Sequence, residues 1–533
     1  MSTETAHLDR FVIGGLPEPD RWPEITLEHP LYDYPDRLNA ATELLDAAVE
    51  RGWGSRPCTG LGDDMWTYDD LLDRSNRIAR VLVEDFGLVT GNRVLLRGPN
   101  APWMVAAWFA VLKVGAVAVV TMPLLREPEL RSIYAKCGPV VALCAEGMEE
   151  PLRAVTDAPI ASWGPHGDLS AAVATKPGSF VDVDTAATDP ALLGFTSGTT
   201  GEPKAAVHFH RDLLVIADSF QPLLKARADD VFVGSPPLAF TFGLGGEVVF
   251  PMRVGASTWF CERPGPAALA ELIETRRATV CFTAPTAYRA MMGLEPRPDL
   301  SSLRRGVSAG EMLPSATFEL VERATGIRLI DGLGATELLH IFVSAADEEI
   351  RPGATGRPLP GWRAAILDDA GNELGDGEIG RLAVKGPIGC RYLNDDRQSD
   401  YVQDGWNITG DVYVRDEDGY YWYQARADDM IISSGYNIAA PEVEDSLLSH
   451  PLVAEAGVVG DPDPERGMIV HAYVHLIDPA LASDTLSTEL QDHVKRTIAP
   501  YKYPRRITFC PEPLPKTHTG KLQRRRLGAP APD

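Results

Sequence analysis

The chain has 533 residues, of which 44% are hydrophobic and 23% are charged, and its formal net charge at pH 7 is −25. This length is sufficient for two to four domains with a large core, and the composition is ordinary for a soluble globular protein. Nucleic acid is excluded as an expected partner because phosphate contacts require many Lys and Arg side chains. An ATP site, which needs only local positive charge, remains compatible with this composition.

The cysteines and the apolar segments bear on the compartment. Seven cysteines are scattered without a C-x-x-C pair, which predicts free thiols rather than a disulfide framework or a zinc site. The first ten residues are polar and lack the apolar core of a signal peptide. Lys113 and Pro123 interrupt the apolar run 104–125, which favours a buried helix at about 102–113 and a buried strand at 116–121 over a membrane span. We expect a cytoplasmic protein with no membrane partner.

In chain order, the first 60 residues are rich in Pro, Asp and Glu, and we expect them to wrap the surface. A helical pattern at 71–86 is followed by strand patterns at 93–96 and 140–143. Several later apolar strands end in small or polar residues, the usual position of ligand contacts in α/β sheets. The fold class predicted is α/β, with layered, largely parallel sheets in a large N-terminal domain.

The pattern changes in the last third of the chain. Hairpin signals at 368–372, 376–377 and 416–419 predict a small antiparallel β subdomain. Beyond it, alternating helix and strand patterns predict a smaller α+β domain. We place the boundary so that the two domains are residues 1–427 and 428–533.

The segment 194–204 reads GFTSGTTGEPK and lies between two apolar stretches. Small residues allow backbone N–H groups to converge on an anion, hydroxyls add donors, and Lys204 adds a positive charge. The spacing differs from a Walker A loop, and the apolar flanks disfavour a flexible Gly/Ser/Thr linker. The sequence therefore predicts a phosphate-binding loop, with Thr196, Ser197, Gly198, Thr199, Thr200, Gly201 and Lys204 as ligand contacts.

Three further stretches carry phosphate or sugar chemistry. Thr336-Glu337 could bond a phosphate oxygen and hold Mg²⁺, although Thr336 could also be a helix N-cap. Asp411 suits the two hydroxyls of a ribose, with turn chemistry as its alternative, and Arg426 could act beside it or lie on the surface. Lys521 could neutralise charge between a carboxylate and an α-phosphate, unless it is merely solvated.

These motifs occur from about residue 60 onward in the order typical of the adenylate-forming superfamily, which includes acyl-CoA synthetases, carrier-loading adenylation domains and luciferases, and the chain resembles that family. Leu333 departs from the pattern, since many members carry an aromatic residue that stacks near adenine. The resemblance implies Lys521, Thr336 and Glu337 as catalytic residues, Glu337 as metal ligand, and further ATP or AMP contacts at Ala309, Gly310, Glu311, Asp331, Gly332, Gly334, Ala335, Asp411 and Arg426.

The resemblance also implies a moving C-terminal domain. Asp428 matches the hinge position of the family, and Gly435 and Tyr436 match the segment that approaches the active site for thioester formation. Residues 1–427 would then bind ATP and the acid, while residues 428–533 would form a mobile domain that carries the adenylation lysine.

Within the superfamily the chain is most similar to benzoate- and 2-aminobenzoate-CoA ligases. Two Phe residues beside glycines can form a flat slot for an aromatic ring, although Phe240 could equally be ordinary core. The acid pocket implied by this similarity contains Phe240, Thr241, Phe242, Gly243, Gly334, His340 and Ile341.

We therefore predict an ATP-dependent aryl-acid CoA ligase with ATP and CoA as substrates and Mg²⁺ as cofactor. An aromatic carboxylic acid would form an aryl-adenylate and then a CoA thioester. A stand-alone enzyme that loads a separate carrier protein is the first alternative. A non-catalytic nucleotide-binding protein is the second, and the presence of Lys204, Lys521 and Glu337 argues against it. A homodimer is left open as the oligomeric state.

Overall fold

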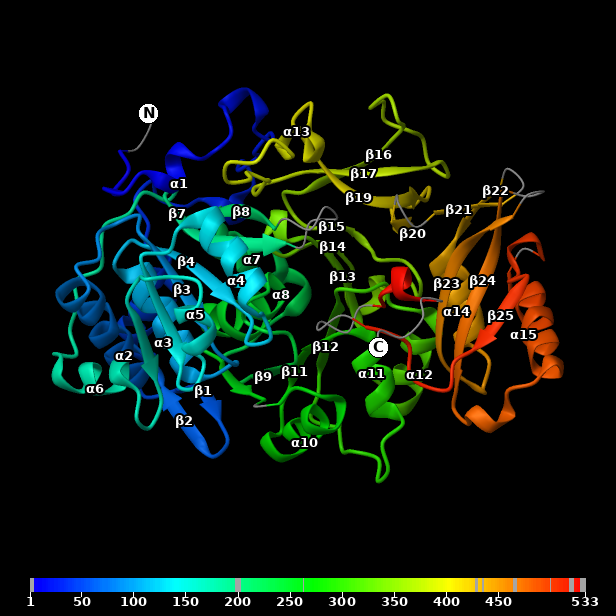
Figure 1. The fold of residues 1–533 in the computed structure, drawn as a ribbon, viewed down its shortest axis with the longest axis horizontal. Helices are drawn as coiled ribbons and strands as arrows, with labels where there is room; N and C mark the ends of the chain where they lie inside the picture. The colour runs from blue at the N-terminus through cyan, green and yellow to red at the C-terminus, as the bar shows by residue number, and fades with distance from the viewer. Residues whose placement is uncertain are drawn as a thin grey trace.

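The computed structural model describes residues 4–196, 203–261, 263–426, 430–433, 436–463, 467–498, 500–516 and 522–527. A large N-terminal body, blue to yellow in Figure 1, adjoins a smaller orange and red unit at the C-terminal end. The described strands form four sheets. This arrangement confirms the predicted α/β class, with layered sheets, a small β subdomain and a smaller C-terminal α+β domain.

The first sheet is parallel except at its edge, where β8 runs antiparallel to β7. The helix α3 (Pro102–Lys113) and the strand β4 confirm the buried helix and strand predicted from the apolar run. No helix among the described residues combines the length and apolar character that a membrane crossing requires. The strands of this sheet are, in spatial order, β6 (Ile160–Trp163), β5 (Val141–Ala145), β3 (Arg93–Arg97), β4 (Val117–Thr121), β7 (Pro190–Thr196) and β8 (Lys204–Phe209).

In the second sheet six neighbouring strands run parallel to one another, and antiparallel strands lie at both of its edges. Helices α7 (His210–Leu224), α10 (Pro266–Arg276), α11 (Pro285–Met292) and α12 (Ser315–Thr325) connect or flank its strands. In spatial order the strands are β15 (Arg357–Pro358), β14 (Ile341–Ser344), β13 (Ile330–Gly334), β12 (Arg305–Ala309), β11 (Val280–Thr283), β9 (Val231–Gly234), β10 (Ser257–Phe260), β1 (Pro57–Leu61) and β2 (Asp64–Thr67).

The N-terminal segment corrects one expectation. Residues 24–26 do lie on the surface subdomain, where the Thr26 N–H donates to Gly386 O at 3.0 Å and the Glu24 N–H donates to Gly405 O at 2.9 Å. Residues 40–48, however, form a largely buried helical stretch whose apolar side chains join the main core. The Pro- and acid-rich composition of the first 60 residues concealed this short apolar stretch. The prediction that these residues wrap the surface was therefore wrong for this part.

The predicted helix at 71–86 begins slightly earlier, as α2 (Tyr68–Arg80), and continues to Asp85. Thr67 caps it: its side chain accepts a hydrogen bond from the Asp70 N–H, while the Asp70 carboxylate accepts one from the Thr67 N–H. This reciprocal capping box fixes the start of the helix.

The small β subdomain is an antiparallel sheet at the top of Figure 1. Its hairpins lie where turn signals predicted them. The strands are β16 (Arg363–Leu367), β17 (Ile379–Lys385), β18 (Val402–Gln403), β19 (Trp406–Arg415) and β20 (Tyr421–Arg426), and α13 (Gln398–Tyr401) precedes β18.

The C-terminal unit has a hydrophobic core of its own. It contacts the N-terminal body through polar bonds: Arg289 donates to Leu448 O at 3.2 Å and to Val453 O at 3.3 Å, and the Ala316 N–H donates to the Asp445 carboxylate at 3.2 Å. The predicted hinge, Asp428, lies outside the described residues. The elements are β21 (Met430–Ser433), β22 (Tyr436–Ala439), α14 (Ala440–Leu448), β23 (Val453–Asp463), β24 (Gly467–Leu476), α15 (Asp484–Thr497) and β25 (Arg506–Phe509).

Candidate nucleotide and acid site

The predicted phosphate loop connects β7 to β8, as its apolar flanks indicated. Thr196 and Lys204 are opposite each other in the antiparallel register, so they form the two sides of the loop base. The hydroxyl oxygen of Thr196 is buried without a hydrogen-bond partner in the described part of the chain. The predicted contacts Ser197, Gly198, Thr199, Thr200 and Gly201 lie outside the described residues.

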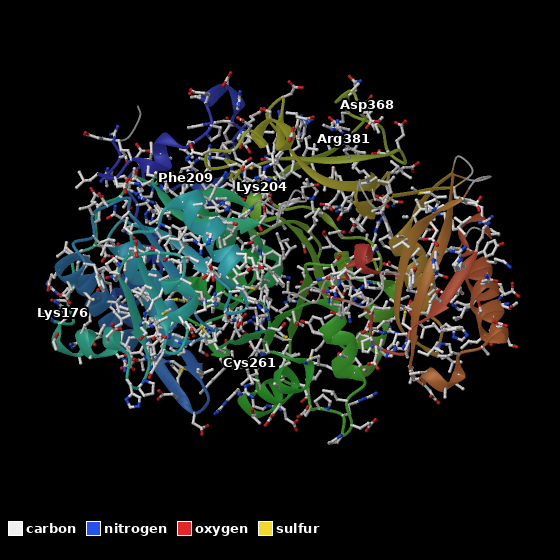
Figure 2. The ribbon with its side chains drawn as sticks, in the orientation of Figure 1. Lys176, Lys204, Phe209, Cys261, Asp368 and Arg381 are labelled. Atoms are coloured by element: carbon white, nitrogen blue, oxygen red, sulfur yellow. The ribbon has the colours of Figure 1, made fainter. Side chains whose placement is uncertain are left out.

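Lys204 and Glu337, far apart in the sequence, meet through a tyrosine that the sequence analysis missed. Lys204 Nζ donates to the Tyr392 hydroxyl at 2.8 Å, and that hydroxyl donates to Glu337 Oε1 at 2.5 Å. Lys204 Nζ itself lies 3.7 Å from Glu337 Oε1. Figure 2 labels Lys204 below the small β subdomain, near Phe209. The geometry thus brings one cation and one carboxylate to the base of the phosphate loop.

Tyr392 is held rigidly. It is 1% exposed, and its backbone N–H donates to Gln398 Oε1 at 2.9 Å. The neighbouring residue Leu393 donates its N–H to Ala205 O at 2.9 Å, which adds the segment to the open edge of β8. Because this segment joins the sheet only through tertiary pairing, the sequence pattern around Tyr392 gave no sign of its position.

Thr336 and Glu337 start a short 3₁₀ turn, η7 (Thr336–Leu338), that packs on the loop base. His208 Nε2 lies 2.8 Å from Thr336 O, and a Cβ at Gly194 would approach the Thr336 methyl carbon to 2.8 Å. The N-cap of the turn is Ala335, so the alternative role of Thr336 as a helix N-cap is wrong. The Thr336 side chain therefore lies against β7, beside the predicted phosphate site.

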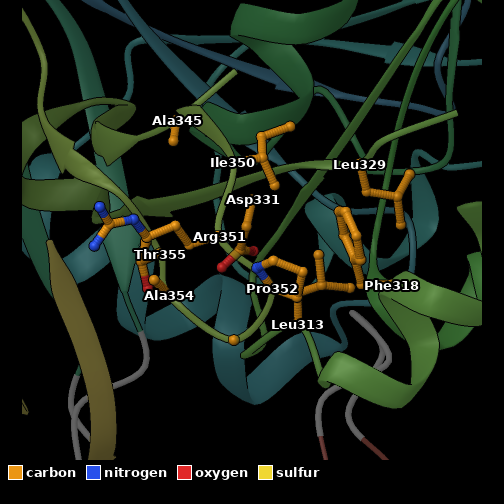
Figure 3. A pocket seen from close by; sticks show the side chains of 11 residues that line it. Leu313, Phe318, Leu329, Asp331, Ala345, Ile350, Arg351, Pro352, Ala354 and Thr355 are labelled. Atoms are coloured by element: carbon orange, nitrogen blue, oxygen red, sulfur yellow. The ribbon is translucent and has the colours of Figure 1, made fainter. Parts of the chain in front are cut away.

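The residues predicted to contact adenine lie at the ends of two neighbouring strands, β12 and β13. Ser308 pairs with Asp331, and Ala309 pairs with Gly332. Gly310 has a φ of +90°, a conformation that glycine adopts without strain, and Glu311 comes directly after it. Asp331 Oδ1 is buried without a hydrogen-bond partner in the described ranges, and burial raises the pKa of this carboxyl to about 8. Figure 3 shows Asp331 pointing into a small pocket that Leu313, Phe318, Arg351 and Thr355 also line.

The predicted ribose residue is next to this segment. Asp411 is 8% exposed on β19 and pairs in register with Arg426 on β20. Tyr413 lies near the carboxylates of both Asp331 and Asp411, and its hydroxyl is 3.2 Å from the Thr355 hydroxyl. The structure therefore brings the predicted adenine and ribose carboxylates to the same region.

The predicted acid pocket coincides with an aromatic cluster at α8 (Thr241–Leu244) and the turns that continue it to Val254. The ring of Phe242 is 5.7 Å from that of His340 and 5.6 Å from that of Phe282, and Phe250 packs edge-on at 4.6 Å from His340. Phe240 is the N-cap of α8 and has no aromatic partner among the described residues. Phe282 and Phe250 were not predicted; the position of Phe282 near the end of a predicted strand was the one available signal.

Glycines allow this cluster to form. A Cβ at Gly245 would lie 2.4 Å from His340 Cδ2, and one at Gly246 would lie 2.6 Å from the Phe282 ring. Of the predicted residues, Gly243 packs on the carbonyls of two prolines and Gly334 packs on the backbone of His340. Ile341 covers the Cα of Gly332, with its Cδ1 2.4 Å from where a Cβ would be. The predicted acid-pocket residues are thus contiguous, with Thr241 at the first position of α8.

His340 is 3% exposed, and both ring nitrogens lack a hydrogen-bond partner in the described part of the chain. Burial lowers the pKa of this imidazole to about 3, so it is neutral at physiological pH. A neutral imidazole offers one hydrogen-bond donor and one acceptor.

We expect His340→Phe to change how stability depends on pH. The unfolded state binds a proton with a pKa near 6.5 and the folded state does so only near 3, so the wild type loses unfolding free energy as pH falls through this window. The substitution should reduce that slope by about 1.4 kcal/mol per pH unit between about pH 4 and 6. Urea titrations at several pH values measure it. The exposed His166, replaced by Phe, is the control; an unchanged slope for His340→Phe would contradict a buried neutral imidazole.

Mg²⁺ binding is compatible with the residues present. No group of three His, Cys, Asp or Glu able to hold a metal occurs in the described ranges. Proteins usually hold Mg²⁺ through one or two carboxylates together with substrate phosphates. Glu337, whose Oε1 accepts a hydrogen bond from the Tyr392 hydroxyl near Lys204, is a carboxylate that fits that role.

Comparison with known proteins gives the family. Residues 46–391 match the family model of AMP-binding enzymes, and residues 442–521 match the AMP-binding enzyme C-terminal domain. The benzoate–CoA ligase of Thauera aromatica is 33% identical, over 93% of this chain and 97% of that relative. The 3-hydroxybenzoate–CoA ligase of Aromatoleum sp. (strain CIB) is 31% identical, over 92% and 96% respectively.

A solved structure extends the match to three dimensions. The anthranilate CoA ligase AuaEII, in complex with anthranoyl-AMP, is 32% identical with a TM-score of 0.89, over 93% of this chain and 98% of that one. These findings confirm the resemblance to adenylate-forming enzymes that was inferred from the motifs. The chain belongs to the AMP-binding enzyme family.

Proposed function

We propose that this enzyme is an aryl-acid CoA ligase that forms an aryl-adenylate and then an aryl-CoA thioester. The observation that carries this proposal is the contiguity of the aromatic cluster with the phosphate site. His340, against the Phe242 ring, lies only three residues after Glu337, which contacts Lys204 through Tyr392. An acid whose ring packed on Phe242 would hold its carboxylate near Thr336. Relatives named for benzoate, 3-hydroxybenzoate and anthranilate support the same substrate class.

In the first half-reaction, Thr196 and Lys204 bind the phosphates of ATP, and Asp411 binds the ribose. Asp331, protonated because of its raised pKa, offers one donor and one acceptor to the edge of adenine. Mg²⁺ held at Glu337 would supply positive charge to the phosphates. A carboxylate oxygen of the acid attacks the α-phosphorus, the bond to the pyrophosphate oxygen breaks, and Lys521 neutralises the charge that develops between them.

In the second half-reaction, the CoA thiolate attacks the acyl carbon of the adenylate and AMP leaves. Between the two half-reactions the C-terminal domain rotates about Asp428. This rotation removes Lys521 from the site and brings Gly435 and Tyr436 to it. The contacts that Arg289 and Asp445 make between the two units are polar, as is usual where domains move relative to one another. A stand-alone enzyme that loads a carrier protein is the alternative, because a carrier presents the same thiol arm.

His340 is the basis for our proposal about which substituent the aromatic ring of the substrate carries. Its two unpartnered nitrogens favour an acid with an ortho-amino or hydroxyl group, so 2-aminobenzoate is the first substrate to test. We also propose that the reaction takes place in the cytoplasm. The seven cysteines are free thiols, which is the state that a reducing compartment maintains.

The proposal is tested by AMP release with a panel of benzoates and octanoate, each with and without CoA. Benzoates should be activated and octanoate should be a poor substrate, because a flexible chain loses about 0.5–1.5 kcal/mol for each immobilised rotamer-rich group.

Phe242→Ala should weaken the use of benzoate by about 2–12-fold, since ring pairs contribute about 0.5–1.5 kcal/mol. If AMP release were faster with octanoate than with every benzoate, the assignment of an aryl acid as substrate would be wrong. If turnover did not depend on CoA and were stimulated only by a carrier protein, the assignment of CoA as the thiol acceptor would be wrong.

A further inference from the structure

A second positively charged pocket lies on the N-terminal body, apart from the nucleotide site. Its walls come from the N-terminal segment, from the start of α7, from the segment before α13, and from the loop that precedes β19. It is open to solvent and is lined by Pro19, Trp22, Pro23, Glu24, Ile25, Leu27, Arg211, Arg391 and Gly405.

Arg391 is the central residue of this pocket. It is 5% exposed, and its guanidinium lies between two aromatic rings, 4.4 Å from the Trp22 centroid and 4.9 Å from the Phe209 centroid. Arg391 Nε is buried with no hydrogen-bond partner in the described ranges. Burial lowers the pKa of the guanidinium to about 10, so it remains charged. A buried charge normally requires pairing.

Arg211 supplies a second guanidinium whose Nε is also buried without a hydrogen-bond partner among the described residues. Among the described residues, the carboxylate that interacts electrostatically with both arginines is Asp212, which is 2% exposed and accepts a hydrogen bond from the Phe209 N–H. Arg211 forms an ion pair with it, with Arg211 Nε 3.7 Å from Asp212 Oδ1, a separation longer than a hydrogen bond. The other acid on the wall, Glu24, binds Lys385 at 2.5 Å. Two guanidiniums against one carboxylate leave net positive charge.

We propose that this pocket binds a small anion carrying a phosphate or carboxylate group. Guanidinium groups match both acids with paired N–H donors, and stacking on aromatic rings pre-organises them. The positive charge is local, since the chain as a whole carries −25. The side chains of Arg391 and Tyr392 alternate along an extended segment, so the anion site and the Lys204 contact lie on opposite faces of it.

The test is calorimetric titration of the full chain with inorganic phosphate and, separately, with succinate. A non-cleavable α,β-methylene analogue of ATP saturates the nucleotide site first, so that phosphate binding there does not contribute. The wild type should bind at least one of the two anions, and the one bound identifies the acid group that the pocket prefers. Arg391→Gln should weaken that binding about tenfold or more, since a charge-assisted hydrogen-bond donor is lost.

Arg211→Gln provides a second measurement, because Arg211 is less buried and its loss should leave folding intact if Arg391→Gln does not fold. Arg363→Gln, which removes an exposed arginine paired with Glu373 at 2.9 Å, is the matched control and should bind like the wild type. Absence of binding by the wild type, or equal binding by the wild type and Arg211→Gln, would overturn the proposal.

Discussion

Lys521→Ala is expected to lower acid-dependent pyrophosphate release by about 100- to 1000-fold, the usual loss when one group that stabilises transition-state charge is removed. Thioester formation from preformed aryl-AMP and CoA should remain within a few-fold of the wild type. The physical reason is that negative charge accumulates between the carboxylate and the α-phosphate only during adenylation. In thioester formation the acyl group has already been activated as the adenylate, and AMP is its leaving group.

The two half-reactions are measured separately, the first by isotope exchange between pyrophosphate and ATP and the second by thioester formation from synthetic aryl-AMP. Lys516→Ala is the matched control: it removes a lysine from the same C-terminal segment, one that binds Glu455 at 2.6 Å within the C-terminal unit. It should leave both half-reactions intact. Equal losses in the two half-reactions for Lys521→Ala would contradict a role confined to adenylation.

The features of the fold that could be predicted are those with strong local signals. The hairpin turns and the buried run that became α3 and β4 were both apparent in the pattern of residues. Lys113 interrupts that run because it forms a buried pairing with Asp182 at 2.8 Å and contacts Asp46, whose positions the sequence did not indicate. The buried helical stretch at 40–48 was missed because its few apolar residues lie within a segment that is otherwise rich in Pro, Asp and Glu.

The residues of the candidate site also divide into those that the sequence could predict and those that it could not. Phosphate-loop composition identified Thr196 and Lys204, and the resemblance to relatives identified Phe242 and His340, which the structure places in contact. Tyr392 and Phe282 could not be found, since each acts through tertiary contacts made by residues that look like ordinary core. Residues whose function depends on a neighbour distant in sequence carry no periodic or turn signal of their own.

Tyr392→Phe is expected to reduce kcat/KM for ATP by about 10- to 100-fold. Hydrogen bonds to charged groups contribute about 1.5–3 kcal/mol, and the substitution removes the hydroxyl that both Lys204 and Glu337 contact. Without it, the lysine and the carboxylate lose the group that holds them at the loop base, 3.7 Å apart. The fold should persist because the phenyl ring still packs on Tyr401 at 5.8 Å.

A positioning role for Tyr392 makes a selective prediction. KM for ATP and the Mg²⁺ concentration at half-maximal rate should both rise, while KM for the acid stays near its wild-type value, because the aromatic slot does not touch the hydroxyl. Tyr421→Phe is the matched control, since it deletes a buried hydroxyl that donates to Ala364 O at 2.6 Å in the small β subdomain, and it should leave KM for ATP unchanged. If Tyr392→Phe raised KM for ATP and for the acid equally, or lowered only thermal stability, Tyr392 would be a structural residue and the pairing of Lys204 with Glu337 would not depend on it.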